Sequence, residues 1–409
     1  MTNGFPAALT WNVTNSLSQD GPLDIRAAFT DGTTTAYSSP HTVTVDRNAG
    51  TAPSADVGPG SVNALTGDFT LSDTDASGFD VSVSRTASSR RPTAGADAEG
   101  QVAIFGPQRT SGTTAEITES DWAYIRKTSA TSATSATSLA LVDVDGDETG
   151  FTATTGGGWK PEPGSEDLTL TGSVTGTFTL KDDEGTITTF AKVDSAATTW
   201  QVASTYLPTD NSTTKVVSEK VASGSNTLAR PKYVIAPTTA VSADKCQTAI
   251  DSVTAASQDA FTNASDTTGC RVMQFVYASS TTATSSAFGN YAGQVQQVKL
   301  WAITPGAGTT TATVISQYAY DTSGRLREQW DPRISPALKT AYTYDSAGRV
   351  ATLTPPGELP WTFTYGSAGN AATAGEGMLL KASRPNLTAG TKSTTDGTTA
   401  PAVWSTTCR

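Results

Sequence analysis

Two stretches near the C-terminal end of the chain share one pattern, and that pattern decides the fold. They are Tyr318-Ala319-Tyr320-Asp321-Thr322-Ser323-Gly324-Arg325-Leu326 and Tyr342-Thr343-Tyr344-Asp345-Ser346-Ala347-Gly348-Arg349-Val350. The pattern Y-x-Y-D-x-x-G-R-[LV] recurs after 24 residues, and a weaker copy, Phe363-Thr364-Tyr365-Gly366, follows without the aspartate. A period of roughly 20 to 25 residues indicates a repeat architecture.

Each copy of the pattern predicts a β-hairpin. Tyr318 and Tyr320 lie two residues apart, so their side chains point to the same face of a strand. Asp321 begins a turn by bonding nearby backbone, and Gly324 supplies the positive φ angle. One hairpin cannot bury an aromatic face alone, so successive units must stack side by side. The other motif residues with structural roles are Arg325, Tyr342, Tyr344, Asp345, Gly348 and Arg349.

The composition of the 409-residue chain favours an all-β protein. Hydrophobic residues make up 36% and charged residues only 16%, and the residues that favour helices are scarce. Thr-rich alternating segments with many glycines predict short antiparallel strands and turns. Acidic residues followed by glycine predict hairpin turns within residues 139–151 and 176–190, and residues 240–268 are expected to hold one short helix.

Charge and the length of apolar runs exclude two classes of partner. The formal net charge is −11 and no long basic run is present, so binding to a nucleic-acid backbone is not expected. No apolar stretch approaches the ~20 residues of a membrane span. The N-terminus lacks the segments of a signal peptide. Either the parent protein carries export information upstream or, as we prefer, this chain starts inside a longer reading frame.

Residue types that support catalysis or metal binding are few. Three cysteines and one histidine provide too few ligands at suitable spacing for zinc. His41 is expected at the start of a strand rather than as a catalytic base. Asp143, Asp145 and Asp147 suggest a calcium loop, but the glycine stands at position four and no glutamate at position twelve, so a β-turn is expected. No metal and no cofactor is predicted.

The cysteines suggest one disulfide. Cys246 and Cys270 stand 24 residues apart and flank the segment with the expected helix. A disulfide between them would contribute about 3 kcal/mol by restricting the unfolded chain. The alternative is two buried free thiols. Cys408 is expected to be unpaired within this chain.

The N-terminal part has its own pattern. Residues 9–13, 23–29 and 42–46 alternate like strands, and the turn Asp31-Gly32 lies between them. Residues 1–47 therefore look like the last strands of an immunoglobulin-like or fibronectin-like sandwich, which needs about 100 residues when complete. The Pro- and Gly-rich residues 48–59 predict a linker.

The repeated pattern resembles the YD repeat of the Rhs and teneurin families. Residues 60–69, 83–86, 278–291 and 330–339 also look like parts of actinobacterial wall-associated Rhs-repeat proteins. The resemblance implies a long antiparallel sheet that spirals into a hollow, cocoon-like shell, which in complete members commonly encloses a C-terminal toxin. It divides the chain into an N-terminal shell segment at residues 60–312 and YD repeats at residues 313–409. We recognise neither a plug-like segment nor a toxin-like tail.

The resemblance predicts a non-catalytic structural fragment of a large secreted or cell-surface protein. Its expected partners are the rest of the parent shell and an enclosed C-terminal effector, and its expected location is extracellular or cell-wall associated.

Two other functions remain open from the sequence. A carbohydrate-binding or adhesive cell-wall module would use tryptophans as sugar-stacking platforms, although large aromatic residues more often fill the face between hairpins. A glycan-active hydrolase would use a carboxylate pair, such as Glu116 with Glu119 or Glu162 with Glu166. The tryptophans considered are Trp159, Trp200, Trp301, Trp330 and Trp361.

Overall fold

A computed structural model describes most of the chain, and its described residues are almost entirely β-structure. The described ranges are 21–45, 52–79, 81–92, 100–111, 120–128, 135–143, 148–237, 241–253, 259–261, 267–303, 306, 308–367 and 375–385. Within them the strands form a large antiparallel sheet of 18 strands, a five-stranded sheet and two two-stranded sheets. The predicted all-β class is confirmed.

The first part of the large sheet closes on itself. Strand β10 pairs with β11 on one side and with β17 on the other, so strands β10 to β17 form a ring. Its interior is apolar: Trp200 is fully buried there and meets the ring of Phe178 edge-on at 5.0 Å. The strands are β10 (Trp122–Lys127), β11 (Ser138–Asp143), β12 (Glu148–Ala153), β13 (Trp159–Pro161), β14 (Thr169–Gly172), β15 (Phe178–Lys181), β16 (Ile187–Ala191) and β17 (Thr199–Leu207).

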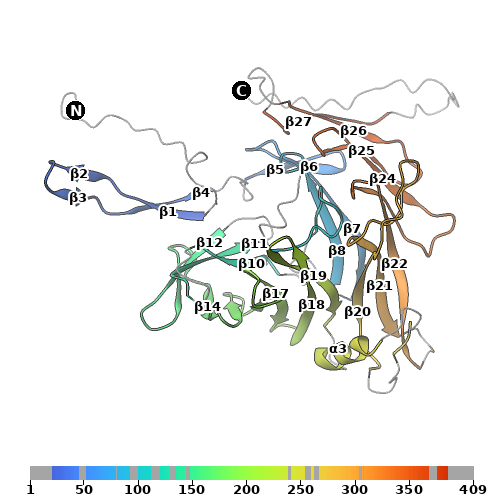
Figure 1. The fold of residues 1–409 in the computed structure, drawn as a ribbon, viewed down its shortest axis with the longest axis horizontal. Coiled ribbons are helices and arrows are strands. Elements are labelled where there is room, and N and C mark those ends of the chain that lie inside the picture. Colours follow the sequence, from blue (N-terminus) through green and yellow to red (C-terminus); the bar gives the residue numbers. More distant parts are fainter. Residues whose placement is uncertain are drawn as a thin grey trace.

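The second part of the large sheet is an open arc that continues from the ring. Neighbouring strands pair in sequence order up to β27, and Figure 1 shows the arc curving from β18 round to β27. The predicted boundary at 312/313 falls inside a strand, because the sheet runs through it without a break. The strands are β18 (Ser212–Ser223), β19 (Asn226–Ile235), β20 (Val272–Tyr277), β21 (Val295–Ile303), β22 (Thr310–Tyr320), β23 (Leu326–Trp330), β24 (Lys339–Tyr344), β25 (Val350–Thr354), β26 (Trp361–Tyr365) and β27 (Leu379–Ser383).

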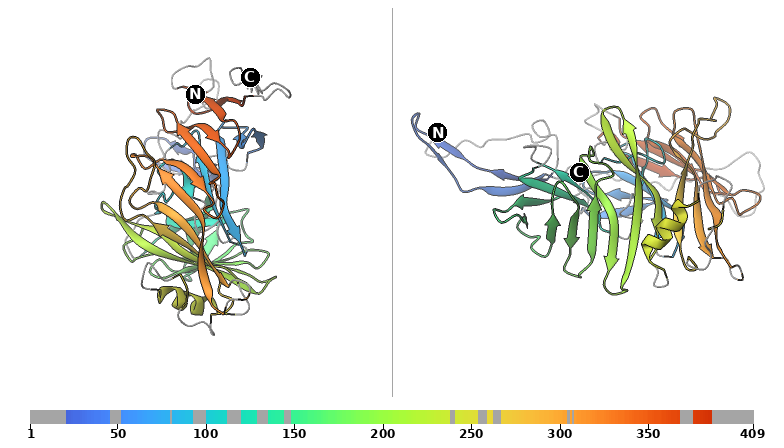
Figure 2. Two further views of the ribbon diagram at one scale, coloured as in Figure 1. Left: turned by 90° about the vertical axis from the view of Figure 1, so that its right-hand side faces the viewer. Right: turned by 60° about the horizontal axis from the view of Figure 1, so that its bottom comes forward.

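The five-stranded sheet lies on the inside of this arc, and we call it the inner sheet. Figures 1 and 2 show its strands, in blue, beside the orange strands of the arc. Alternating side chains of β8 are buried, and they share one apolar core with residues from β18 to β27. The inner strands are β5 (Ser54–Val57), β6 (Gly60–Asn63), β7 (Phe69–Gly78), β8 (Val81–Ser88) and β9 (Thr110–Ser111).

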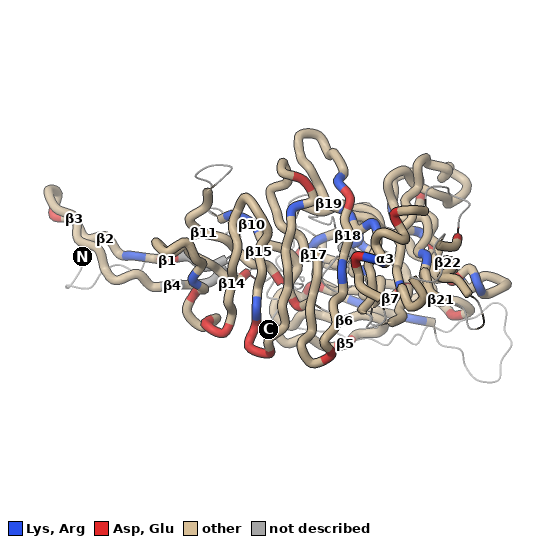
Figure 3. The backbone as a smooth tube through the Cα atoms, turned by 90° about the horizontal axis from the view of Figure 1, so that it is seen from below, with Lys and Arg blue, Asp and Glu red and all other residues tan. Residues whose placement is uncertain are grey.

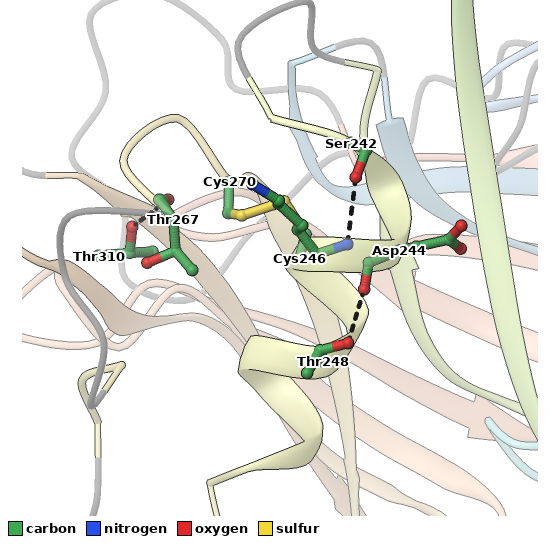
Figure 4. Close-up of a disulfide and its surroundings, with 8 residues drawn as sticks. Ser242, Asp244, Cys246, Thr248, Thr267, Cys270 and Thr310 are labelled. Atoms are coloured by element: carbon green, nitrogen blue, oxygen red, sulfur yellow. Dashed lines mark hydrogen bonds between the residues drawn. A yellow bond between two sulfur atoms is a disulfide. The ribbon is translucent and has the colours of Figure 1, made fainter.

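The helix α3 (Ala243–Asp251) lies between β19 and β20, within the segment where one was expected. Ser242 caps it by accepting a hydrogen bond from the backbone N–H of Lys245, a common way to satisfy a free helix donor. A disulfide joins Cys246 of the helix to Cys270 before β20 (Figure 4). Both cysteines are buried in a small core with Trp301, so the disulfide ties the helix to the sheet.

The N-terminal segment differs from the expected sandwich. Strands β1 (Gly21–Ile25) and β4 (His41–Val45) pair, and β2 (Ala28–Thr30) pairs with β3 (Thr35–Tyr37). Together they form one hairpin that projects from the molecule in Figure 1, with Asp31 holding its turn. No second sheet covers this hairpin within the described residues, so the immunoglobulin-like fold is not confirmed. Residues 9–13 lie outside the described ranges.

The linker predicted at residues 48–59 is wrong for its second half. Residues 54–57 are strand β5, which pairs with β6 through Val57 opposite Gly60. Two of the residues that suggested a linker, Gly58 and Pro59, lie in the turn between β5 and β6, where Gly58 adopts a φ of +62°. Proline and glycine mark a tight β-turn as readily as a flexible segment, and the sequence pattern did not separate these two cases.

Candidate functional site

The aspartate of each YD motif organises the turn that closes its hairpin. One Asp321 carboxylate oxygen accepts hydrogen bonds from the backbone N–H groups of Ser323 (2.9 Å) and Arg325 (3.1 Å). The other oxygen accepts from the Arg325 Nε at 2.9 Å. Gly324 takes a φ of +73°. The Arg325 side chain closes the turn, and the returning strand begins at Leu326.

The second motif repeats this arrangement. Asp345 accepts from the backbone N–H groups of Ala347 and Arg349, both at 2.9 Å, and from the Arg349 Nε at 2.9 Å. Gly348 has a φ of +88°. Two turns with the same three hydrogen bonds to the aspartate indicate that the motif encodes this geometry.

The second tyrosine of each motif ties one hairpin to the hairpin before it. The Tyr344 hydroxyl donates to the Leu326 carbonyl at 2.6 Å, while the Arg325 guanidinium lies 5.6 Å from the centre of the Tyr344 ring. Tyr365 donates in the same way to Val350 (2.7 Å). A guanidinium over an aromatic ring and a hydroxyl that donates to a carbonyl are both stabilising contacts. We call this pair of contacts the tyrosine lock.

Replacing Asp345 by alanine is expected to destabilise the protein by about 1–3 kcal/mol, because two backbone donors and the Arg349 side chain lose their acceptor. Urea denaturation followed by circular dichroism measures the loss. The matched control is Asp183→Ala in the β15–β16 turn, next to Asp182, which holds that turn. A loss in the control as large as the loss in Asp345→Ala would contradict the structural role of Asp345.

The first tyrosine of each motif faces the inner sheet and is buried. Tyr318 contacts the ring of Phe105 at 4.9 Å between ring centres, and Phe363 of the weaker third copy contacts Phe69 at the same distance. The predicted aromatic face therefore exists. Its partner is the inner sheet together with the segment around Phe105, which the sequence did not identify.

Tyr342 meets a buried ion cluster on the inner sheet. Arg85 donates from Nε and Nη2 to the two oxygens of Asp75 (2.7 and 2.8 Å) and from Nη2 to the Tyr342 hydroxyl at 2.8 Å. Tyr342 in turn donates to Asp73 at 2.6 Å. The side chains of Arg85 and Asp75 are 1% and 2% exposed. This cluster links β7 and β8 to β24, so it connects the inner sheet to the YD repeats.

Burial has the largest effect on the pKa values of this cluster. Desolvation raises the pKa of Asp75, against the opposing effect of the Arg85 charge. Desolvation also raises the pKa of Tyr342 far above its usual value. The Arg85 charge stays in place because Asp75, Tyr342 and Asp73 outweigh the cost of its burial.

A second buried arginine lies against the same tyrosine. Arg109 is fully buried, with its guanidinium 4.3 Å from the centre of the Tyr342 ring. Its three side-chain nitrogens have no hydrogen-bond partner among the described residues. Tyr342 is therefore flanked by two arginines, Arg85 and Arg109, and its ring carries contacts that its position in the motif does not reveal.

One signal in the sequence could have identified Arg85. The strand Val81–Ser88 alternates, and its buried positions are Val81, Val83, Arg85 and Ala87. An arginine on the apolar face of an alternating strand predicts a buried ion pair. Phe105 and Arg109 lie outside regular strands, so no periodicity marks them.

Of the carboxylates proposed for a hydrolase, the structure describes one pair. Glu162 and Glu166 lie in the connection between β13 and β14. Glu162 is half-buried and burial raises its pKa, whereas Glu166 is exposed and accepts a hydrogen bond from the Gly164 backbone. Glu116 and Glu119 lie outside the described residues. The lone histidine, His41, is exposed on β4.

The tryptophans contribute mainly to packing. Trp200 and Trp301 are fully buried, and their ring nitrogens donate to the Gly176 carbonyl and to the Gln274 side chain. The other three considered as sugar platforms, which are half-buried, are Trp159, Trp330 and Trp361.

Charged residues of both signs are mixed along the described strands and turns. Figure 3 shows Lys and Arg interspersed with Asp and Glu rather than gathered in one basic tract. Among the described residues no group of three or more His, Cys, Asp or Glu side chains is arranged to hold a metal ion. In that same part of the chain, no helix is long and apolar enough to cross a membrane.

One comparison with known proteins agrees with the motif. A sequence model described as the RHS Repeat matches residues 320–358, which include both YD turns. A solved structure titled "Crystal Structure of TcdB2-TccC3-TEV" is similar over 78% of this chain, with 13% identity and a TM-score of 0.36. The matched part is 16% of that chain. A search of curated proteins found no match. The predicted resemblance to the Rhs/YD-repeat family is confirmed.

Proposed function

We propose that this chain, a structural fragment of an Rhs-type β-shell, forms the opening wall of a shell that encloses or presents a C-terminal effector. The observation that carries the proposal is the use of the motif side chains. Their aspartates and arginines close turns, and their second tyrosines bond the preceding hairpin. Such residues build a wall and are not free to act on a substrate.

The inner sheet supports the same role. It packs against the concave face of the arc through buried aromatic residues and the Arg85 cluster, so this end of the wall has a packed interior. A wall of this kind works mechanically, by excluding proteases and water from whatever the remaining shell encloses. The disulfide between Cys246 and Cys270 fits an oxidising, extracellular location.

Protease protection tests the proposal. The full protein encoded by the same reading frame is expected to keep its C-terminal part intact at a protease concentration that digests that part when it is produced alone. The double variant Tyr344→Phe with Tyr365→Phe, which weakens two tyrosine locks, should expose the C-terminal part to cleavage. Equal digestion of the enclosed and isolated forms would contradict the proposal.

The same preparation separates the two alternatives. Sedimentation with cell-wall polysaccharide, together with quenching of tryptophan fluorescence, would indicate an adhesive module. Hydrolysis of a glycan panel that is lost in Glu162→Gln and retained in Asp183→Asn would indicate an enzyme. The wall proposal expects neither result.

A further inference from the structure

In four hairpins of the arc, the last strand pair before the turn, which we call the closing pair, is of one kind. The RHS Repeat match covers only residues 320–358. In each hairpin a tyrosine pairs with a valine or leucine, and the register shifts at the residue just before the tyrosine. The closing pairs are Tyr277 with Val295, Tyr320 with Leu326, Tyr344 with Val350 and Tyr365 with Leu379.

The residues around these pairs also match. An aromatic residue stands two positions before each tyrosine, and a glycine with positive φ stands two positions before each aliphatic partner. In the β20–β21 hairpin these are Phe275, which is buried, and Gly293, with a φ of +84°. The corresponding glycines of the other hairpins are Gly324, Gly348 and Gly377, with φ of +73°, +88° and +79°.

The hydroxyl bond of the tyrosine lock, without its cation, extends to the β20–β21 hairpin. Tyr320 donates its hydroxyl to the Val295 carbonyl at 2.6 Å, as Tyr344 does to Leu326 and Tyr365 does to Val350. Val295 therefore holds the acceptor position of a YD unit. Gln294 stands directly before Val295, where the recognised units have arginine. This unit therefore keeps the hydrogen bond from the Tyr320 hydroxyl but lacks the cation over the Tyr320 ring.

A segment beneath the hairpins contacts three of them in turn. Residues 100–109, which we call the strap, cross the concave side of the arc. The Ile104 carbonyl accepts from the Val295 backbone N–H at 3.0 Å. Gly106 lies against the Gly324 turn, where a Cβ atom on Gly106 would meet the Gly324 carbonyl at 2.5 Å, and a Cβ atom on Gly348 would lie 3.4 Å from the Gln108 side chain. The strap thus advances two residues for each hairpin.

We infer that the β20–β21 hairpin is a further YD unit, with residues 278–294 standing where the five-residue Asp-x-x-Gly-Arg turn stands in the two recognised units. The register, the glycine and the hydroxyl bond all place Tyr277 and Val295 in the same positions as Tyr344 and Val350. The inserted loop is then an addition to the rim of the shell, held to the next hairpin by two backbone hydrogen bonds between Gly289 and Tyr320.

A turn exchange tests this inference. Residues 278–294 are replaced by Asp-Ser-Ala-Gly-Arg, the turn of residues 345–349, which joins the same closing pair. The variant is expected to unfold cooperatively, with a Tm within about 5 °C of the parent chain. A second variant carries the same turn with one extra serine, which shifts the register of the hairpin and turns its buried side chains outward. This variant should lose more than about 10 °C or fail to fold. If the in-register exchange is as damaging as the out-of-register one, the inference is wrong.

Single substitutions give a second test that does not require replacing the loop. Tyr277 donates its hydroxyl to the Pro231 carbonyl, with the Arg230 guanidinium 3.8 Å from the centre of its ring. Tyr277→Phe and Tyr344→Phe should therefore lower the Tm by similar amounts, about 2–4 °C. Tyr291→Phe, within the loop, is the control and should leave the Tm unchanged. An unchanged Tm in Tyr277→Phe beside a lowered one in Tyr344→Phe would overturn the assignment.

Discussion

Replacing Arg85 by alanine is expected to destabilise the protein by about 3–5 kcal/mol, because Asp75 would be left buried without its counter-charge. Arg85 also holds the Tyr342 hydroxyl, so the change releases the inner sheet from the YD repeats. Guanidinium denaturation followed by circular dichroism measures the loss, and near-ultraviolet circular dichroism reports the packing around Tyr342.

The control for Arg85→Ala is an exposed arginine with similar geometry. Arg333 forms a pair with Asp331 at 2.7 Å, but its side chain is 56% exposed, so Arg333→Ala should cost less than about 1 kcal/mol. The double variant Arg85→Met with Asp75→Leu removes both charges and should recover much of the stability lost in Arg85→Ala. If Arg85→Ala costs no more than Arg333→Ala, the cluster does not join the two sheets.

Acid should reduce the damage in Arg85→Ala. Burial already raises the pKa of Asp75 in the parent protein, and removal of the Arg85 charge raises this pKa further. A carboxylate with a raised folded-state pKa favours the folded state only while it is protonated. Its destabilising effect therefore grows as the pH rises above the unfolded value of about 4 and disappears below it.

The hairpins of this protein could be predicted from sequence because their determinants are local. Asp321 and Gly324 fix a turn within five residues, and the alternation of Tyr318 and Tyr320 fixes which face is aromatic. Contacts of this range are present in the motif itself. The sequence also predicted one short helix within residues 240–268, where α3 (Ala243–Asp251) lies and contains Cys246.

The partners of those hairpins could not be predicted, because they lie far away along the chain. Arg85 and Tyr342 are separated by 257 residues, and the closure of the ring depends on β10 meeting β17. Periodicity shows that a face is buried and does not show what covers it. The repeat at the β20–β21 hairpin was also missed in the sequence. The motif pattern requires a fixed number of residues between tyrosine and glycine, and the loop at residues 278–294 is longer than that.

Alkaline pH is expected to unfold the protein steeply, starting near the usual tyrosine pKa of about 10. Burial raises the pKa of Tyr277, Tyr318, Tyr320 and Tyr342 well above that value. For a group whose folded-state pKa is raised, the stabilisation is complete below the unfolded pKa and is lost as the pH rises towards the folded pKa. Each such tyrosine then removes about 1.4 kcal/mol per pH unit.

Four tyrosines acting together remove about 5 kcal/mol per pH unit, and a typical domain has only about 5–15 kcal/mol of stability in total. The far-ultraviolet circular dichroism should therefore collapse within about two pH units above 10, and the absorbance of tyrosinate should rise in the same narrow step. Separate transitions, with tyrosinate forming while the strands remain, would show that these hydroxyls are accessible in the folded state.

Two variants assign the alkaline transition to the concave face of the arc. Tyr318→Phe removes a buried hydroxyl but keeps the ring against Phe105, so the midpoint should move to higher pH. Tyr37→Phe removes a tyrosine that is 66% exposed on the projecting hairpin and should leave the midpoint where it is. Because the tyrosines lie between the arc and the inner sheet, a shift in the first variant alone would show that their ionisation separates these two layers.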